Sequence, residues 1–255
     1  HELYERRRFA HFIDVALHDA AISQKTLDAM MEAVRDRAEI PRRGLRIKAR
    51  AMNVPAISWF DLEAPLPLAS AERIPWERGV ELVRASFGRS YPRLQRYFDA
   101  ALDRRWRESE PRPSKRPGAY CIHSDMANEV RVFMTYQGSL GDVSTLAHEV
   151  GHAFHADVMR GVRVLGRQYP MTLAETASTF AESILSDGLL ADPTLSKSAR
   201  ALLLGEAVAD GAAFLLDVPT RFHFERAFYE ERKSGEVPTS RISELMVAAQ
   251  RSTFG

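Results

Sequence analysis

The chain has 255 residues, of which 45% are hydrophobic and 27% charged, and this is enough for one large globular domain with a substantial core. Its 35 basic and 34 acidic side chains give a net charge of +1, which indicates no nucleic-acid or membrane-surface partner. We find no apolar run long enough to span a bilayer and no signal-like segment. The single cysteine, Cys121, forbids an internal disulfide and suits a reducing compartment, so we expect a cytoplasmic location.

The first hundred residues have helical patterns that one proline-rich stretch interrupts. Apolar residues at helical spacing predict a helix from Tyr4 to His18 and a second over 24–38, which we expect to stop before Pro41. Residues 41–75 contain five prolines and are expected to be irregular. Helical patterns return across 76–108.

The only clear β signal comes from two short runs, "AYCIHS" and "EVRVFMTYQ", which predict an antiparallel hairpin within 118–137. Cys121 lies in the first run, and we interpret it as a buried structural residue. Helical patterns then cover 143–160, 173–187, 196–217, 220–234 and 240–252. The predicted fold class is therefore mainly α, with a small antiparallel β-hairpin before the helix at 143–160.

That helix carries the sequence "LAHEVGHAFH", in which His148 and His152 are four residues apart and Glu149 follows the first histidine. The pattern H-E-x-x-H is typical of zinc hydrolases, because two imidazoles one turn apart can bind one ion while the glutamate lies beside it. The remaining face of the helix is apolar, as expected for packing on a core. We expect Asp142 or Ser144 to cap the helix and Gly161 to end it.

A catalytic zinc site needs a third protein ligand, and His155 lies one turn too far along the helix to supply it. The extended motif H-E-x-x-H-x-x-G-x-x-H is not present either. Glu175, 23 positions after His152, is the candidate, although Thr172 and Glu175 also fit a capping box that would use the glutamate at a helix start. We expect Glu182 and Ser178, on the same polar face, to contact the site, with His155 near the substrate.

The segments "TLAHEVGHAFH" and "AETASTFAE", with the hairpin before them and "FHFERAFYEERKSGEVPTSRISELMVAAQRSTFG" after them, resemble the oligoendopeptidase F and thimet oligopeptidase family of zinc metallopeptidases. The resemblance is strongest to the oligoendopeptidase F branch and extends over nearly the whole chain. It implies one Zn²⁺ per chain, held by His148, His152 and Glu175, with Glu149 as the general base. It also implies a zincin-like helical fold in which substrate pairs with the edge of a small sheet, here "VRVFMTY".

Members of this family are considerably longer than 255 residues. The resemblance implies that a tyrosine- and histidine-containing stretch for substrate binding lies beyond the position of Gly255. Tyr120, Tyr136 and His223 do not match that stretch, and Tyr120 stays a candidate for substrate contact. We treat residues 1–255 as one catalytic domain or part of one, made of a helical portion at 1–117, the hairpin at 118–137 and the zinc-site helices at 138–255.

The predicted function is zinc-dependent hydrolysis of peptide bonds in short peptides by metal-activated water with a glutamate base. Two alternatives stay open. A metallocarboxypeptidase can carry the same zinc constellation, because the motif does not distinguish internal from terminal cleavage. A helical domain that binds zinc without turnover would also retain the three ligands.

Overall fold

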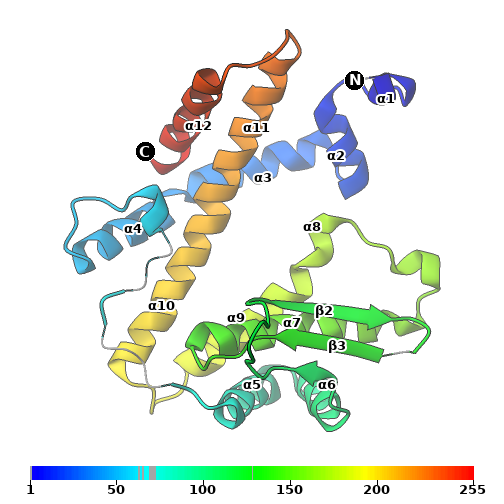
Figure 1. Cartoon of the computed structure of the whole chain (residues 1–255), viewed down its shortest axis with the longest axis vertical. Helices are drawn as coiled ribbons and strands as arrows, with labels where there is room; N and C mark the ends of the chain where they lie inside the picture. The colour runs from blue at the N-terminus through cyan, green and yellow to red at the C-terminus, as the bar shows by residue number, and fades with distance from the viewer. Residues whose placement is uncertain (1, 63, 65, 69–72, 128) are drawn as a thin grey trace. The chain divides into compact units, whose positions relative to one another are not determined.

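The computed structural model describes residues 2–62, 64, 66–68, 73–127 and 129–255, and the fold is mainly helical, as predicted (Figure 1). Contacts between residues divide the chain into two compact units. Unit 1 comprises His1–Leu68 and Leu204–Gly255, and unit 2 comprises Ala69–Leu203. None of the helices in the described ranges is both long and apolar enough to cross a membrane.

Unit 2 contains the H-E-x-x-H motif at residues 148–152 and a small sheet. Its regular elements, in chain order, are α5 (Trp76–Ser90), α6 (Pro92–Asp103), β1 (Arg107–Glu108), β2 (Ala119–Ser124), β3 (Glu129–Met134), α7 (Leu140–Val158), α8 (Met171–Ala174) and α9 (Thr176–Leu190). Two short 3₁₀ turns, Met159–Gly161 and Val164–Arg167, lie between α7 and α8, and α10 (Lys197–Ala212) begins in this unit.

The sheet has three strands in the order β1-β3-β2. The predicted hairpin is confirmed, with β2 antiparallel to β3 and Tyr120 opposite Phe133. The third strand, β1, pairs in parallel with β3 through Arg107 and Val132, and its two residues are too few to show alternation in the sequence. The expectation that "VRVFMTY" forms the sheet edge is wrong, because β3 lies between two strands and β2 is an edge strand.

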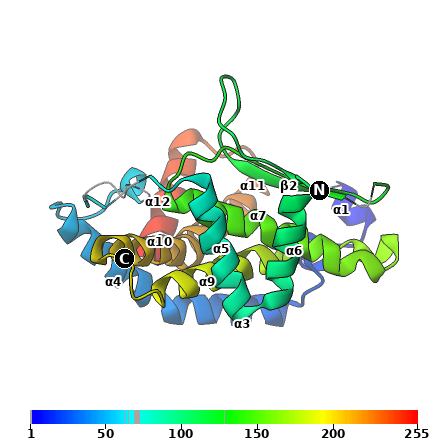
Figure 2. The same cartoon turned by 90° about the horizontal axis from the view of Figure 1, so that it is seen from below.

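Helix α7 lies at the centre of unit 2. Figure 2 shows the sheet on one side of α7 and α9 on the other, and α5 and α6 also contact α7. The core side of α7 contributes Val143, Leu146, Ala147 and Val150, which are all buried against residues of α5, α6 and α9. Burying each of these larger aliphatic side chains contributes about 1.5–3 kcal/mol, so the apolar face fixes the orientation of the polar face.

The ends of α7 differ from the prediction. The helix begins at Leu140, three residues earlier than expected, and its cap is Ser139, whose Oγ accepts a hydrogen bond from the backbone N–H of Asp142 at 3.0 Å. Asp142 completes a capping box by accepting from the backbone N–H of Ser139 at 2.8 Å. Gly161 is not the C-terminal stop, because α7 ends at Val158 and the chain tightens into a 3₁₀ turn.

Unit 1 is helical throughout its regular elements. These are α1 (Glu2–Arg6), α2 (Phe12–Ala20), α3 (Gln24–Arg37), α4 (Glu39–Ala51), a 3₁₀ turn (Trp59–Asp61), the end of α10, a π-turn (Ala213–Asp217), α11 (Val218–Arg232) and α12 (Thr239–Phe254). Helices α11 and α12 lie side by side (Figure 1).

Two predictions for unit 1 are wrong. The helix expected from Tyr4 to His18 is broken, because Arg8 has a φ of +62°, which a right-handed helix cannot accommodate. The irregular stretch expected at 41–75 instead opens with α4, since Pro41 lies in the first helical turn, where its missing N–H would have no helical partner. Residues 63, 65 and 69–72 of that stretch lie outside the described residues.

The break expected between 217 and 220 is replaced by a π-turn. The N–H of Val218 bonds to the carbonyl of Ala213, five residues back. Pro219 follows directly and has no N–H to offer to Leu215. The wider turn therefore lets the helix continue past a proline that would otherwise clash with the preceding turn.

Candidate metal centre

Two imidazoles project from the polar face of α7. His148 and His152 are half-buried, one turn apart, and their ring centroids are 4.7 Å apart. Their Nε2 atoms lie 3.1 Å from each other. The helix places both residues on one face, one turn apart, and because the opposite face of α7 is buried in the core, both imidazoles are directed away from it.

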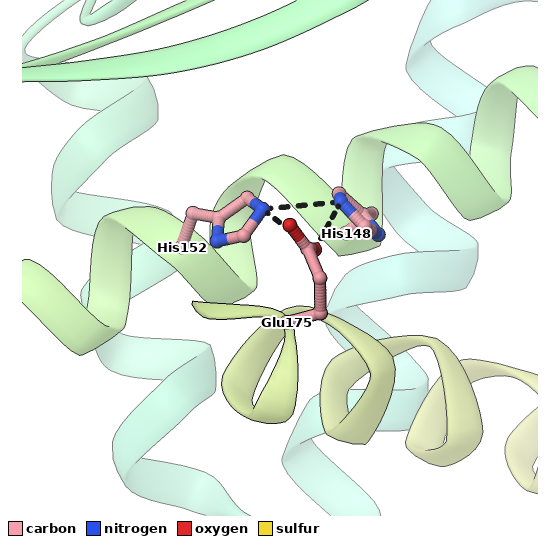
Figure 3. Close-up of side chains that lie close together, drawn as sticks. All are labelled: His148, His152 and Glu175. Atoms are coloured by element: carbon pink, nitrogen blue, oxygen red, sulfur yellow. Dashed lines mark hydrogen bonds and ion pairs between the residues drawn. The ribbon is translucent and has the colours of Figure 1, made fainter. Parts of the chain in front are cut away.

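Glu175 completes a triangle with the two histidines (Figure 3). Its Oε2 lies 3.2 Å from His148 Nε2 and 3.2 Å from His152 Nε2. The three donor atoms therefore converge on one point from two segments 23 residues apart in the chain.

The backbone at Glu175 explains how this carboxylate reaches the histidines. Glu175 lies at the junction of α8 and α9, with φ −91° and ψ 3°, so the chain turns a corner there between two helices. The alternative capping box does not form, because α8 begins at Met171 and has no side-chain cap, and Thr172 lies inside it. The Glu175 side chain is thus available to the histidines.

Ser178 and Glu182 both contact this group from α9. Ser178 Oγ is 2.7 Å from Glu175 Oε2 and 3.0 Å from the Glu175 carbonyl oxygen, and can donate its one hydrogen to either. Glu182 Oε1 is 2.5 Å from His148 Nδ1. If Nδ1 carries the proton of this bond, the lone pair of Nε2 is directed to the centre of the triangle.

The pKa values of the two imidazoles shift in opposite directions. The hydrogen bond to the Glu182 carboxylate raises the pKa of His148 above its usual value, although burial opposes this. Burial lowers the pKa of His152, with the charge of Glu175 opposing. A lowered pKa favours the neutral form of His152, which is the form in which imidazole binds a metal.

Glu149 lies on the inner side of the same helical turn and is only 5% exposed. Burial raises the pKa of its carboxyl to about 7, with a lowering contribution from His148 and raising contributions from Glu175 and Glu182. Within the described part of the chain, Glu149 Oε2 is buried without a hydrogen-bond partner. A carboxyl with a pKa near neutrality and a free oxygen has the properties of a general base.

The spacing of the three donor atoms fits a small divalent cation. Zinc–ligand bonds of about 2.0–2.1 Å in a tetrahedron place neighbouring donor atoms about 3.3 Å apart. The separations of 3.1 Å and 3.2 Å are close to that value. Two imidazole nitrogens and one carboxylate oxygen also form the His₂Glu set found in catalytic zinc sites, which leaves the fourth position open.

The remaining candidates lie outside the group of three. His155 has its ring 4.7 Å from that of Tyr169, and burial lowers its pKa. Its Nδ1 is buried with no hydrogen-bond partner among the described residues. Tyr120 is 55% exposed on β2 and its ring stacks on Phe133 at 4.9 Å.

Two further residues lie near the site, and sequence reasoning gave neither of them a role there. Cys121 lies on β2, and its thiol pKa rises to about 12 because of burial and the charge of Glu149. Gly151, between the two histidines, is the other. Its signal was present in the sequence, because a glycine inside a helix often marks close approach of another backbone.

Fold and donor atoms together define a mainly helical protein with a candidate metal site formed by His148, His152 and Glu175. Comparison with known proteins agrees with this mainly helical fold class. The sequence pattern of peptidase family M3 matches residues 93–255. The chain belongs to peptidase family M3, which confirms the resemblance found in the sequence.

Relatives named oligoendopeptidase or oligopeptidase match most of the chain. It is 31% identical over 230 residues to the oligoendopeptidase F homolog of Lactococcus lactis subsp. lactis (strain IL1403), covering 88% of this chain and 37% of that protein. It is 28% identical over 231 residues to the group B oligopeptidase PepB of Streptococcus agalactiae serotype III (strain NEM316), with 88% and 37% covered. The chain therefore spans about 37% of the length of these relatives.

Solved structures show the same fold. A structure from Chlamydophila abortus has a TM-score of 0.78 at 24% identity and covers 98% of this chain and 42% of that one. PZ peptidase A, solved with an inhibitor, has a TM-score of 0.73 at 14% identity and covers 97% and 44%. At such identities these likenesses establish the fold, and the function is argued from the site.

Proposed function

We propose that this protein hydrolyses peptide bonds in short peptides, with His148, His152 and Glu175 holding one zinc ion and Glu149 acting as the general base. The observation that carries the proposal is the triangle of donor atoms at 3.1 Å and 3.2 Å, with a buried carboxyl beside it. Membership of peptidase family M3 and relatives named oligoendopeptidase F support the choice of substrate.

When bound, the ion would lower the pKa of a water molecule and polarise the scissile carbonyl. The protein moves the proton. Glu149 accepts it from the attacking water at a carboxylate oxygen and then donates it to the nitrogen of the leaving amine, which returns the carboxylate to its starting state. A neighbouring cation favours the ionised carboxylate, so Glu149 starts as a base in spite of its burial.

The site also has an edge strand that can bind an extended peptide. Strand β2 is the outer strand next to β3, and it packs on α7. A peptide that adds to this edge would be held by main-chain hydrogen bonds, which select for an extended backbone rather than for a particular sequence.

The test compares the wild type with Glu149→Gln. We expect about one zinc per chain in both variants by elemental analysis, and a loss of about 10²–10⁴ in kcat in the variant on a quenched fluorescent peptide. Hydrolysis that survives the substitution would contradict the role of Glu149, and absence of stoichiometric zinc would contradict the site.

The same assay separates the two alternatives. Peptides with blocked and free C-termini are compared, and cleavage of free ones alone would favour a carboxypeptidase. Stoichiometric zinc without any hydrolysis by the wild type would favour a metal-binding protein without turnover.

A further inference from the structure

We propose that Gly151 and Ser178 are positioning residues for the third ligand, because together they set the distance between α7 and α9 and the direction of the Glu175 carboxylate. This inference rests on the metal site proposed above, and it explains how a carboxylate from a separate helix reaches two histidines to within 3.2 Å.

Gly151 allows the two helix backbones to approach closely. A Cβ atom at this position would lie 2.6 Å from the carbonyl oxygen of Ala177 and 2.7 Å from the Cα of Ser178. Both are backbone atoms of α9, so no side-chain rotation can relieve the overlap. Any larger residue must move α9 away from α7 by about 0.5–1 Å to restore ordinary contact distances.

Ser178 connects this helix contact to the ligand. It is fully buried, its Cα is one of the backbone atoms that face Gly151, and its Oγ lies 2.7 Å from Glu175 Oε2. That carboxylate oxygen is the same one that faces both histidines. Ser178 therefore contributes both to the close approach of α9 to α7 and to the direction of the Glu175 side chain.

The Glu175 side chain needs such support. It is 59% exposed, and a glutamate at the surface ordinarily samples several rotamers. The hydrogen bond from Ser178 restricts it to the rotamer whose Oε2 completes the triangle. Partners that orient a ligand in this way typically contribute about 10–100-fold to metal affinity.

The chain offers a matched control for each substitution. Ser183 also lies on α9, is exposed, and donates its hydroxyl to the carbonyl of Thr179 at 2.8 Å. Gly188 is a second close approach of α9, where a Cβ would lie 2.6 Å from Ser86 Cβ on α5. Gly188→Ala should thus strain the packing of α9 on a helix other than α7.

The experiment measures the Zn²⁺ dissociation constant of the full chain by competition with a chromophoric chelator. We expect it to rise about 10–100-fold in Ser178→Ala and in Gly151→Ala, and to stay within about twofold in Ser183→Ala and Gly188→Ala. The Co²⁺-loaded protein gives a second readout that a general loss of stability would not change. Its visible bands should change in shape and intensity only in the first two variants, because these bands follow the ligand set.

The outcomes separate this inference from the proposed function. Stoichiometric zinc binding by the wild type, with all four variants alike, would overturn the inference and leave the zinc site in place. An equal loss in Gly188→Ala and Gly151→Ala would also overturn it, because a general shift of α9 would then explain both. A wild type that binds no zinc overturns both proposals. If Gly151→Ala does not fold, the comparison of Ser178→Ala with Ser183→Ala tests the inference, because each of these variants removes one hydroxyl from α9.

Discussion

At the scale of single residues, the contact between His148 and Glu182 has a measurable consequence. Glu182 Oε1 is 2.5 Å from His148 Nδ1 and raises the pKa of that imidazole. Glu182→Gln keeps the size of the side chain but removes the negative charge that favours a proton on His148 Nδ1. We expect the zinc dissociation constant to rise about tenfold, the lower end of the range for such partners.

The control for this measurement is Asp187→Asn, which removes an exposed carboxylate from the same helix. Its zinc affinity should equal that of the wild type. Equal zinc affinity in Glu182→Gln and in the wild type would mean that Glu182 does not orient His148.

The sequence predicted best those site residues that lie close to one another along the chain. His148 and His152 share one helical turn, so their spacing alone brings the two imidazoles together. Glu175 depends on the crossing of α7 and α9 and on a corner between α8 and α9, which are tertiary features. The sequence therefore favoured Glu175 as the ligand but left a capping box as a second explanation, which is excluded because Thr172 lies inside α8 and does not cap it.

At the scale of elements, the start of α7 determines how firmly the motif helix is held. The capping box of Ser139 and Asp142 satisfies backbone N–H groups that the first helical turn leaves without partners. Asp142 Oδ2 also accepts from the N–H of Gln137 at 3.0 Å, so it connects the helix to the segment that follows β3. We expect Ser139→Ala to lower the free energy of unfolding by about 1 kcal/mol, measured by chemical denaturation.

Ser144→Ala is the matched control, because Ser144 lies inside α7. Its substitution should change the free energy of unfolding by less than about 0.5 kcal/mol. A larger effect at Ser144 than at Ser139 would place the functional cap at Ser144, one of the two positions expected from the sequence.

The elements that the sequence predicted incorrectly share a physical cause. Each depends on a backbone detail that hydrophobic periodicity does not report. Arg8 breaks a periodic pattern by its positive φ, Pro41 fits within a first helical turn, and Pro219 is passed by a π-turn. Strand β1 is two residues long and exists because β3 offers it a partner. Periodicity identifies which face is buried, and these details decide where an element begins and ends.

At the scale of the whole molecule, all residues of the candidate metal site belong to one of the two units. All three donor residues, Glu149 and Glu182 lie in unit 2. Unit 1 holds α1–α4, α11 and α12, which contribute none of these side chains. A ligand that binds only the folded form of unit 2 should therefore stabilise that unit selectively.

This selectivity is observable by hydrogen exchange with and without zinc. At a free zinc concentration 100 times the dissociation constant, binding stabilises the folded form by about 2.7 kcal/mol, which corresponds to about 100-fold slower exchange of amides that open by unfolding of the unit. We expect slower exchange in α7 and α9 and unchanged exchange in α11 and α12. A His148→Ala, His152→Ala double variant should show no zinc effect in either unit. Equal slowing in both units would mean that the chain unfolds as one cooperative body, in which case zinc bound between two helices stabilises all of it.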